Sequence, residues 1–114
     1  MDLTMTRGDT PTWTITIKRQ GSVVDLTGAT IKFTARKTVD SPDVFFQKST
    51  TGGGITISSP AANGICVLAL DAADTNSLPI SKDTTLLVDL EVTESDGYKS
   101  TTLGTLLVQV DITR

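Results

Sequence analysis

The fold class is decided by the stretch TWTITIK, residues Thr12–Lys18, in which polar and apolar residues alternate strictly. Successive side chains of a β-strand point to opposite faces, so this period of two is typical of a strand with one buried face. Trp13, Ile15 and Ile17 would then face a core, and the threonines between them would face solvent. We therefore predict a strand over residues 12–18.

Similar strand signals recur along the rest of the chain, at spacings of about 8–12 residues. They cover residues 23–26, 29–37, 44–48, 55–57, 65–70, 84–93, 98–103 and 104–113. Asp96-Gly97 predicts a two-residue hairpin turn. Gly104 predicts a bulge that resets which side chains face inward.

The continuous apolar run at residues 65–70 is typical of a strand that is covered on both faces. A single open sheet would leave one of those faces wet, so two packed sheets are favoured. Asp71 is a plausible helix N-cap and Leu78-Pro79 closes the stretch that follows it. We predict one all-β domain over residues 1–114, a two-sheet antiparallel β-sandwich of about seven to nine strands. At most one short helix is expected, near residues 71–78.

Composition excludes several classes of function. The chain has 114 residues with 10 Lys and Arg against 13 Asp and Glu, a net charge of −3, which disfavours nucleic acid and anionic membranes as partners. It contains no histidine, so Ser-His-Asp catalysis and His-ligated metal sites are excluded. No apolar run approaches the ~20 residues of a membrane span, and residues 1–6 lack the features of a signal peptide. We expect a soluble protein that is made in a cytoplasm.

Carboxylates are the remaining candidates for chemistry. Asp89 and Glu91 share one strand face about 7 Å apart, which permits a paired-carboxylate site, but a solvated face is the favoured interpretation. Asp71, Asp74 and Asp83 could contribute to a Ca²⁺ site, although no calcium-binding spacing supports it and a helix cap is favoured.

Three further motifs have structural interpretations. Gly52-Gly53-Gly54 is no phosphate loop, because no Lys-Ser/Thr pair and no helix follow it. Cys66 lacks a partner for an internal disulfide and is expected to be a small buried residue. Arg7-Gly8-Asp9 matches the tripeptide that integrins read, but we interpret Gly8 as a chain-reversal residue beside a turn that Asp9 caps. We predict no enzyme activity, no cofactor and no metal.

Aromatic residues are the candidate protein contacts. Trp13 is either a core anchor, which is the default, or an interface anchor. Neighbouring residues on a strand point to opposite faces, so one of Phe45 and Phe46 faces outward unless both faces of that segment are buried. If one ring faces outward, we expect it to be Phe45, with Phe46 facing inward. The outward ring would then contact a partner.

The chain also resembles a known family. The resemblance rests on Gly8-Asp9 opening into the alternating strand, on the stretch VDLTGATIKF at residues 24–33, on Asn63-Gly64 before an apolar strand, and on Asp96-Gly97. These features are similar to the N-terminal domain of the siphophage baseplate upper protein family and to related immunoglobulin-like modules of phage tail proteins. The resemblance covers nearly the whole chain, and residues 24–33 are its most specific part.

The resemblance implies an immunoglobulin-like sandwich in a bacteriophage virion, assembled in several copies in the host cytoplasm, with no catalytic residues. In that family a long helical segment normally follows this domain, whereas here the last predicted strand runs to Arg114. We therefore expect the module alone, with other phage structural proteins and copies of itself as partners. A tail or baseplate component that links tail core and fibres is expected, with a capsid decoration protein as the alternative and a carbohydrate-binding module as a weaker one.

Assembly is expected to use exposed strand edges. The residues after Gly104 include no Pro or Lys, and Asp2, Leu3 and Thr4 lie in an N-terminal segment that no turn signal tethers. We predict that one of these termini pairs or swaps with a neighbouring subunit, and that the domain folds without residues 1–6.

Overall fold

The computed structural model describes residues 1–37, 44–76, 78 and 82–110 of the chain. Strands dominate the described residues. They are β1 (Asp2–Thr6), β2 (Thr12–Thr16), β3 (Lys18–Arg19), β4 (Ser22–Val23), β5 (Thr30–Arg36), β6 (Val44–Ser49), β7 (Ile55–Ile57), β8 (Ile65–Ala69), β9 (Thr84–Thr93) and β10 (Lys99–Gln109). Two short helical segments accompany them, the 3₁₀ turn η1 (Ala61–Asn63) and the helix α1 (Ala72–Asn76). The predicted short helix is thus present, and η1 is an addition.

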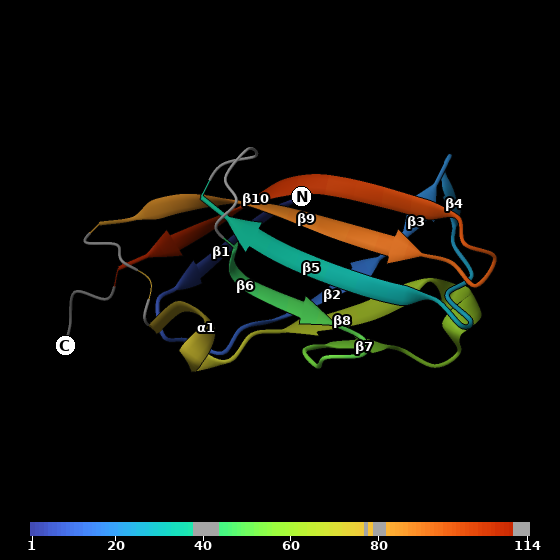
Figure 1. Cartoon of the computed structure of the whole chain (residues 1–114), viewed down its shortest axis with the longest axis horizontal. Coiled ribbons are helices and arrows are strands. Elements are labelled where there is room, and N and C mark those ends of the chain that lie inside the picture. The colour runs from blue at the N-terminus through green and yellow to red at the C-terminus, as the bar shows by residue number, and fades with distance from the viewer. Residues whose placement is uncertain (38–43, 77, 79–81, 111–114) are drawn as a thin grey trace.

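The strands form an immunoglobulin-like sandwich of two sheets. A five-stranded sheet has the order β1-β10-β9-β5-β6, a three-stranded sheet has the order β2-β8-β7, and β3 and β4 form a small hairpin. Figure 1 shows β5 and β6 passing in front of β2 and β8. The chain alternates between the sheets, as Greek-key sandwiches do. The predicted all-β sandwich is confirmed, with one difference, because β1 pairs with β10 in parallel.

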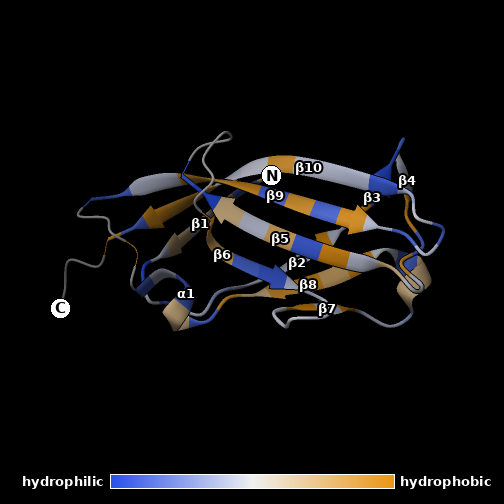
Figure 2. Ribbon diagram, viewed as in Figure 1, coloured by the Kyte–Doolittle hydropathy of each residue, from blue (hydrophilic) through white to orange (hydrophobic). Residues whose placement is uncertain are grey.

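The core lies between the two sheets, where alternate side chains of each strand meet. Hydrophobic and hydrophilic bands alternate along β5 and β9 in Figure 2, as a period of two requires. The largest fully buried apolar side chains are Phe33, Leu26, Ile31, Leu68, Leu70, Leu86, Leu106 and Val108. Leu26 and Leu70 lie just outside strands, and the others come from strands of both sheets. Because the interior is closely packed, a change in any of these residues affects the packing between the sheets.

The predicted strand at residues 12–18 is interrupted at Ile17. The Ile17 N–H donates to the Gly64 carbonyl at 2.7 Å, and the next two residues pair with β4 instead of β8. Gln20 and Gly21 join β3 to β4 with φ values of 54° and 82°. Two consecutive positive φ angles are the signature of the type I′ turn that fits a two-residue hairpin loop.

The predicted hairpin at Asp96-Gly97 has a three-residue loop. Glu94 and Tyr98 still pair, since the Glu94 N–H donates to the Tyr98 carbonyl at 2.8 Å, so residues 95–97 form the loop. Gly97 takes a φ of 91°, and the Asp96 carboxylate accepts from the Tyr98 N–H at 2.9 Å. A left-handed glycine at the end of such a loop is typical of three-residue hairpins, so the signal located the turn but overstated its tightness.

The prediction of a bulge at Gly104 is wrong. β10 pairs with β9 in an unbroken register through this residue, from Lys99 opposite Thr93 to Val108 opposite Thr84. Gly104 is needed for another reason: a Cβ at this position would collide with the Met1 carbonyl oxygen. The glycine therefore permits the close approach of the N-terminal strand.

The N-terminal segment is tethered, contrary to expectation. β1 pairs in parallel with β10, from Asp2 opposite Thr105 to Thr6 opposite Gln109. Met5 is 5% exposed and Leu3 packs against the core, so residues 1–6 contribute to the fold. β1 and β10 thus pair with each other within the chain. That one of the two termini pairs or swaps with a neighbouring subunit, and that the domain folds without residues 1–6, stay predictions.

The run at residues 65–70 is covered on one face only. Cys66, Leu68 and Leu70 are buried between the sheets, whereas Ile65, Val67 and Ala69 are half-buried on the outer side of the three-stranded sheet. The prediction of two covered faces is wrong because neighbouring side chains on β2 and β7 shield the outer face only in part.

Candidate functional site: the outer face of the five-stranded sheet

The outer face of the five-stranded sheet carries the most exposed large apolar side chain of the described residues. Leu103 on β10 is 67% exposed and Val44 on β6 is 44% exposed. The register places Leu87 of β9 diagonally beside Leu103 and in one row with Arg36 and Val44. We call Val44, Leu87 and Leu103 the apolar outer patch.

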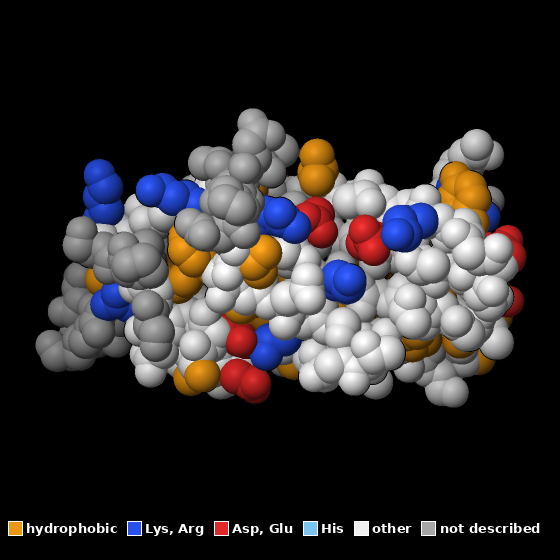
Figure 3. Space-filling view, in the orientation of Figure 1, with side chains coloured by type: hydrophobic (Ala, Val, Ile, Leu, Met, Phe, Trp, Pro, Cys, Tyr) orange, Lys and Arg blue, Asp and Glu red, His pale blue; other side chains and the backbone are white. Residues whose placement is uncertain are grey.

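A shallow depression of about 80 Å³ lies within this patch, and it is lined by Arg36, Leu87, Val88, Asp89 and Leu103. In Figure 3, hydrophobic side chains gather beside the grey atoms, and charged side chains occupy the middle of the same face. An apolar centre with charged neighbours is the arrangement that protein-binding surfaces commonly have.

Sequence reasoning did not find this patch. Leu87 sits on the polar side of the strand at residues 84–93, so the Leu86-Leu87 doublet was the available signal. A bulge at Gly104 was expected, and it left open the face of the sheet to which Leu103 points. Without that bulge, strict alternation from the buried Leu106 would have placed Leu103 outward.

The two predicted phenylalanines differ in burial. Phe46 is 8% exposed, and its ring centroid lies 6.2 Å from that of Phe33 in the core. Phe45 is half-buried and packs partly against the same core. The register shifts at this point, from Ala35 opposite Phe46 to Arg36 opposite Val44, so Phe45 is the extra residue of a bulge. Phe45 thus lies beside the apolar outer patch without standing fully outward.

The other predicted contact residues lie at strand edges. Trp13 is half-buried on β2, packed against the core. Asp2, Leu3 and Thr4 belong to β1, the edge strand of the five-stranded sheet, where Leu3 faces inward and its two neighbours are exposed. The structure therefore separates these four residues from the apolar outer patch or places them at its margin.

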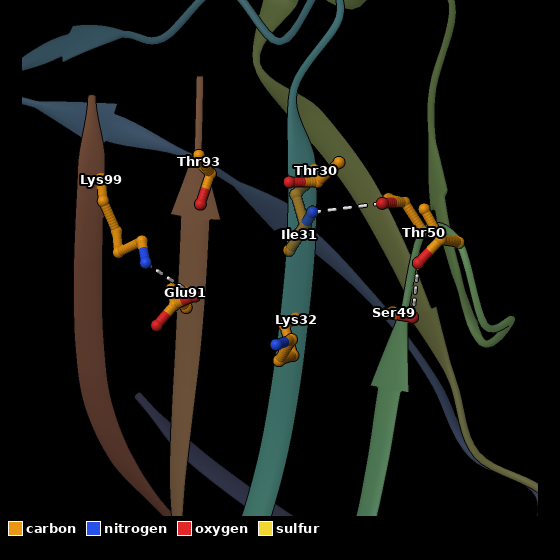
Figure 4. A pocket seen from close by; sticks show the side chains of 9 residues that line it. Thr30, Ile31, Lys32, Ser49, Thr50, Glu91, Thr93 and Lys99 are labelled. Carbon is orange, nitrogen blue, oxygen red and sulfur yellow. Dashed lines mark hydrogen bonds and ion pairs between the residues drawn. The ribbon is translucent and has the colours of Figure 1, made fainter. Parts of the chain in front are cut away.

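A second hollow on the same face is lined mainly by polar groups (Figure 4). It has a volume of about 320 Å³ and is lined by Thr30, Ile31, Lys32, Ser49, Thr50, Thr51, Glu91, Thr93 and Lys99. Internal bonds already use several of these groups: the Thr50 hydroxyl accepts from the Ile31 N–H at 3.2 Å, and the Lys99 ammonium lies 3.8 Å from Glu91. None of the described residues that line it is aromatic, whereas stacking rings are what carbohydrate sites commonly offer.

The predicted carboxylate pair lies on this outer face. Asp89 and Glu91 are both half-buried, and Glu91 faces Lys99 as an ion pair while Asp89 lines the apolar depression. Their different neighbours give them separate structural settings. The arrangement is that of a solvated sheet face with cross-strand charge pairs.

The three aspartates considered for Ca²⁺ do not converge. Asp83 accepts a hydrogen bond from the Val110 N–H at 2.8 Å. Lys48 occupies the space beside the other two, 2.9 Å from Asp74 and 3.4 Å from Asp71. The Asp74 carboxylate also accepts from the Asp71 N–H at 2.7 Å, as the third residue of a helix does in a capping box.

The ammonium group of Lys48 takes the place that a cation would need. Partial burial alone would lower the pKa of Lys48, but the hydrogen bond and charge of Asp74, with those of Asp71, outweigh it and raise the pKa. Lys48 therefore stays charged. Among the described residues, no three His, Cys, Asp or Glu side chains gather as a metal site would require.

The remaining motifs have structural roles. Cys66 is completely buried, and burial raises its pKa to about 11, so the thiol stays protonated. Gly54, at a φ of 97°, lies against the Lys48 stem, where a Cβ would collide. Gly8 has a φ of 87°, the Asp9 N–H closes the turn to the Thr6 carbonyl at 3.0 Å, and the Gly8 N–H donates to the buried Thr75 hydroxyl. No described helix is long and apolar enough to cross a bilayer.

Comparison with known proteins gives structural likenesses alone. No family model matches the chain, and no curated protein does. Among solved structures, murine CRIg is similar over 96% of this chain and 92% of its own, with 16% identity and a TM-score of 0.44. AggA, the major subunit of aggregative adherence fimbriae type I from Escherichia coli, is similar over 96% of this chain and 89% of its own, with 10% identity and a TM-score of 0.33.

Proposed function

We propose that this chain is a non-enzymatic structural module of a bacteriophage particle, which binds neighbouring protein subunits through the apolar outer patch. The observation that carries the protein-binding role is the exposure of Leu103 and Val44 beside Leu87 on the outer face of the five-stranded sheet. Burying such side chains against a partner removes apolar surface from water, and a few anchors of this kind dominate interface energies.

The phage assignment rests on the sequence resemblance, whose most specific part is residues 24–33. In the fold, this stretch forms a turn that leads into β5: the Asp25 carboxylate accepts from the Thr27 N–H at 2.9 Å and from the Thr27 hydroxyl at 2.6 Å. Leu26 is completely buried and its carbonyl accepts from the Ala29 N–H. The residues that carry the resemblance thus have a structural role in the fold. The resemblance therefore supports the type of module more directly than it supports any contact surface.

Within the virion we favour a tail or baseplate position, where the module links tail core and fibres beside other phage structural proteins and further copies of itself. Such a particle is assembled in the host cytoplasm. A capsid decoration role uses the same protein-binding surface and differs only in where the module sits. The hydroxyl-lined hollow lacks the aromatic platform that would favour carbohydrate binding.

The test is incorporation into particles. A phage whose copy of this gene encodes Leu103→Glu should release particles that lack the module, whereas Thr101→Glu, an exposed residue on the same strand and face, should incorporate normally. Immunogold labelling of particles that carry the unaltered protein then separates tail from head. Normal incorporation of Leu103→Glu would contradict the proposed surface, and absence of label from purified particles would contradict the virion role.

A further inference from the structure

The sandwich has four edge strands among its described residues, and they differ in protection. Natural sheets protect their edges with charged residues, prolines, bulges or short strands. β1 carries Asp2, β6 carries Lys48 and the bulge at Phe45, and β7 has three residues. β2 has five residues, TWTIT, with no charge, proline or bulge. β2 is therefore the least protected edge.

The backbone of β2 presents unused hydrogen-bonding groups along this edge. The Ile17 N–H bonds to Gly64, and the Pro11 carbonyl accepts from the Leu70 N–H, so odd-numbered residues face β8. Antiparallel strands alternate these directions, so the N–H and C=O groups of Thr12, Thr14 and Thr16 point away from β8. In the described part of the chain no strand lies on that side.

An apolar groove runs beside the same edge. It has a volume of about 540 Å³ and lies between β2 and strands β9 and β10, with Ile15, Ile17, Leu90, Val92 and Met1 among its lining residues. Trp13 and Ile15, which alternate with the threonines, are both half-buried on this side of β2. An added strand would therefore gain backbone bonds and cover apolar side chains together.

We infer that β2 pairs antiparallel with β2 of a second copy of this chain, about a two-fold axis at Thr14. This register sets Thr14 opposite Thr14 and Thr12 opposite Thr16, so all three outward residues of each strand are paired. The same register makes Trp13 of one copy the direct neighbour of Ile15 of the other. Antiparallel neighbours in such non-hydrogen-bonded positions approach most closely, so these side chains close the open side of the groove.

Charge complementarity favours a second copy as the occupant. Asp9 lies just before β2 and Lys18 just after it, both are exposed, and neither forms an ion pair within the described residues. The antiparallel pairing brings the end of β2 that follows Asp9 beside the end that precedes Lys18 in the other copy, so exposed charges of opposite sign lie at each end of the contact. Two-fold symmetry creates this contact twice. A parallel pairing in register would instead bring like charges together.

The biological meaning of this pairing rests on the proposed assembly role, but the pairing itself is measured on the isolated full chain. Sedimentation equilibrium should give a monomer–dimer equilibrium for the unaltered protein. Thr14→Lys places one ammonium group from each copy at the axis. It should raise the dimer dissociation constant at least about tenfold, because edge lysines oppose strand pairing. Thr56→Lys on β7, an exposed residue of the same sheet, is the matched control and should dimerise normally.

A charge exchange tests the register without altering the strand. Asp9→Lys and Lys18→Asp should each raise the dimer dissociation constant roughly three- to tenfold, as expected for two exposed ion pairs. The variant that combines both changes restores opposite charges and should dimerise nearly as well as the unaltered chain. Circular dichroism and melting temperature check that each variant is folded.

A monomer at every accessible concentration would overturn the inference, as would a dimer that Thr56→Lys disrupts or that Thr14→Lys leaves intact. Failure of the double charge exchange to recover dimerisation would overturn the register. If the module is incorporated into particles but is strictly monomeric, this inference is wrong and the proposed function is unaffected. If the isolated chain forms a dimer through β2 but is absent from particles, the proposed function is wrong and this inference is unaffected.

Discussion

At the scale of single residues, the reactivity of Cys66 reports whether the chain is folded. Its side chain is completely buried, and burial raises its pKa from 9.0 to about 11. Since the thiolate is the reactive form, labelling by iodoacetamide at pH 8 should be roughly 1,000-fold or more slower in the folded chain than in urea, as a stability of about 5 kcal/mol or more requires. Equal rates in both conditions would contradict the burial.

Cys66 also makes the free energy of unfolding depend on pH. Between pH 9 and 11 the unfolded thiol ionises while the folded thiol stays protonated, so the free energy of unfolding should fall as pH rises through this range. Lys48 adds a loss of the same sign at higher pH, because its folded pKa is also raised. Urea unfolding of Cys66→Ala should show a smaller fall than the unaltered chain, and parallel pH profiles would refute the assignment to Cys66.

Adjacent phenylalanines should respond differently to truncation. Phe46→Ala removes a ring packed on Phe33 and should lower the free energy of unfolding by about 3–5 kcal/mol. Phe45→Ala should lower it by about half as much or less, because that ring is only partly buried. Urea unfolding at 25 °C measures both. Equal and large losses would mean that the bulge does not expose Phe45.

At the scale of elements, the parallel contact between β1 and β10 depends on Gly104. Gly104→Val would press a side chain onto the Met1 carbonyl, so the start of β1 must move away. We expect a loss of about 1–3 kcal/mol in the free energy of unfolding, as overpacking causes, together with faster amide exchange at Thr105, whose N–H donates to Met1 at 2.8 Å. Thr102→Val, an exposed change on the same strand, should have neither effect.

The elements also show what sequence reasoning can reach. Alternation at residues 12–18, 29–37 and 84–93 was enough to predict strands and inward faces, because each is a local pattern that the fold preserves. β1 was missed since its partner lies about 100 residues away, and a parallel contact between chain ends leaves no turn signal. Leu103 was missed because a glycine needed for close packing has the same appearance in sequence as a bulge.

At the scale of the whole molecule, the fold should be independent of metal ions. Among the described carboxylates, Asp71 and Asp74 surround a lysine and Asp83 bonds to a backbone N–H, so none of these three needs a cation. EDTA and a reducing agent should each leave the melting temperature unchanged, as followed by circular dichroism. A decrease of several degrees with EDTA, reversed by Ca²⁺, would reveal a metal site that stabilises the folded state.

The parallel contact between β1 and β10 has a mechanical consequence. The Thr105 N–H bonds to the Met1 carbonyl at one end of this contact, and the Arg7 N–H bonds to the Gln109 carbonyl at the other. Because the strands run in the same direction, tension applied through the two chain ends pulls them past each other in shear. All the bonds of the contact then bear the load at once, whereas a hairpin under tension opens bond by bond. A module that is strung between two neighbours by its ends would therefore resist extension along the axis on which they pull.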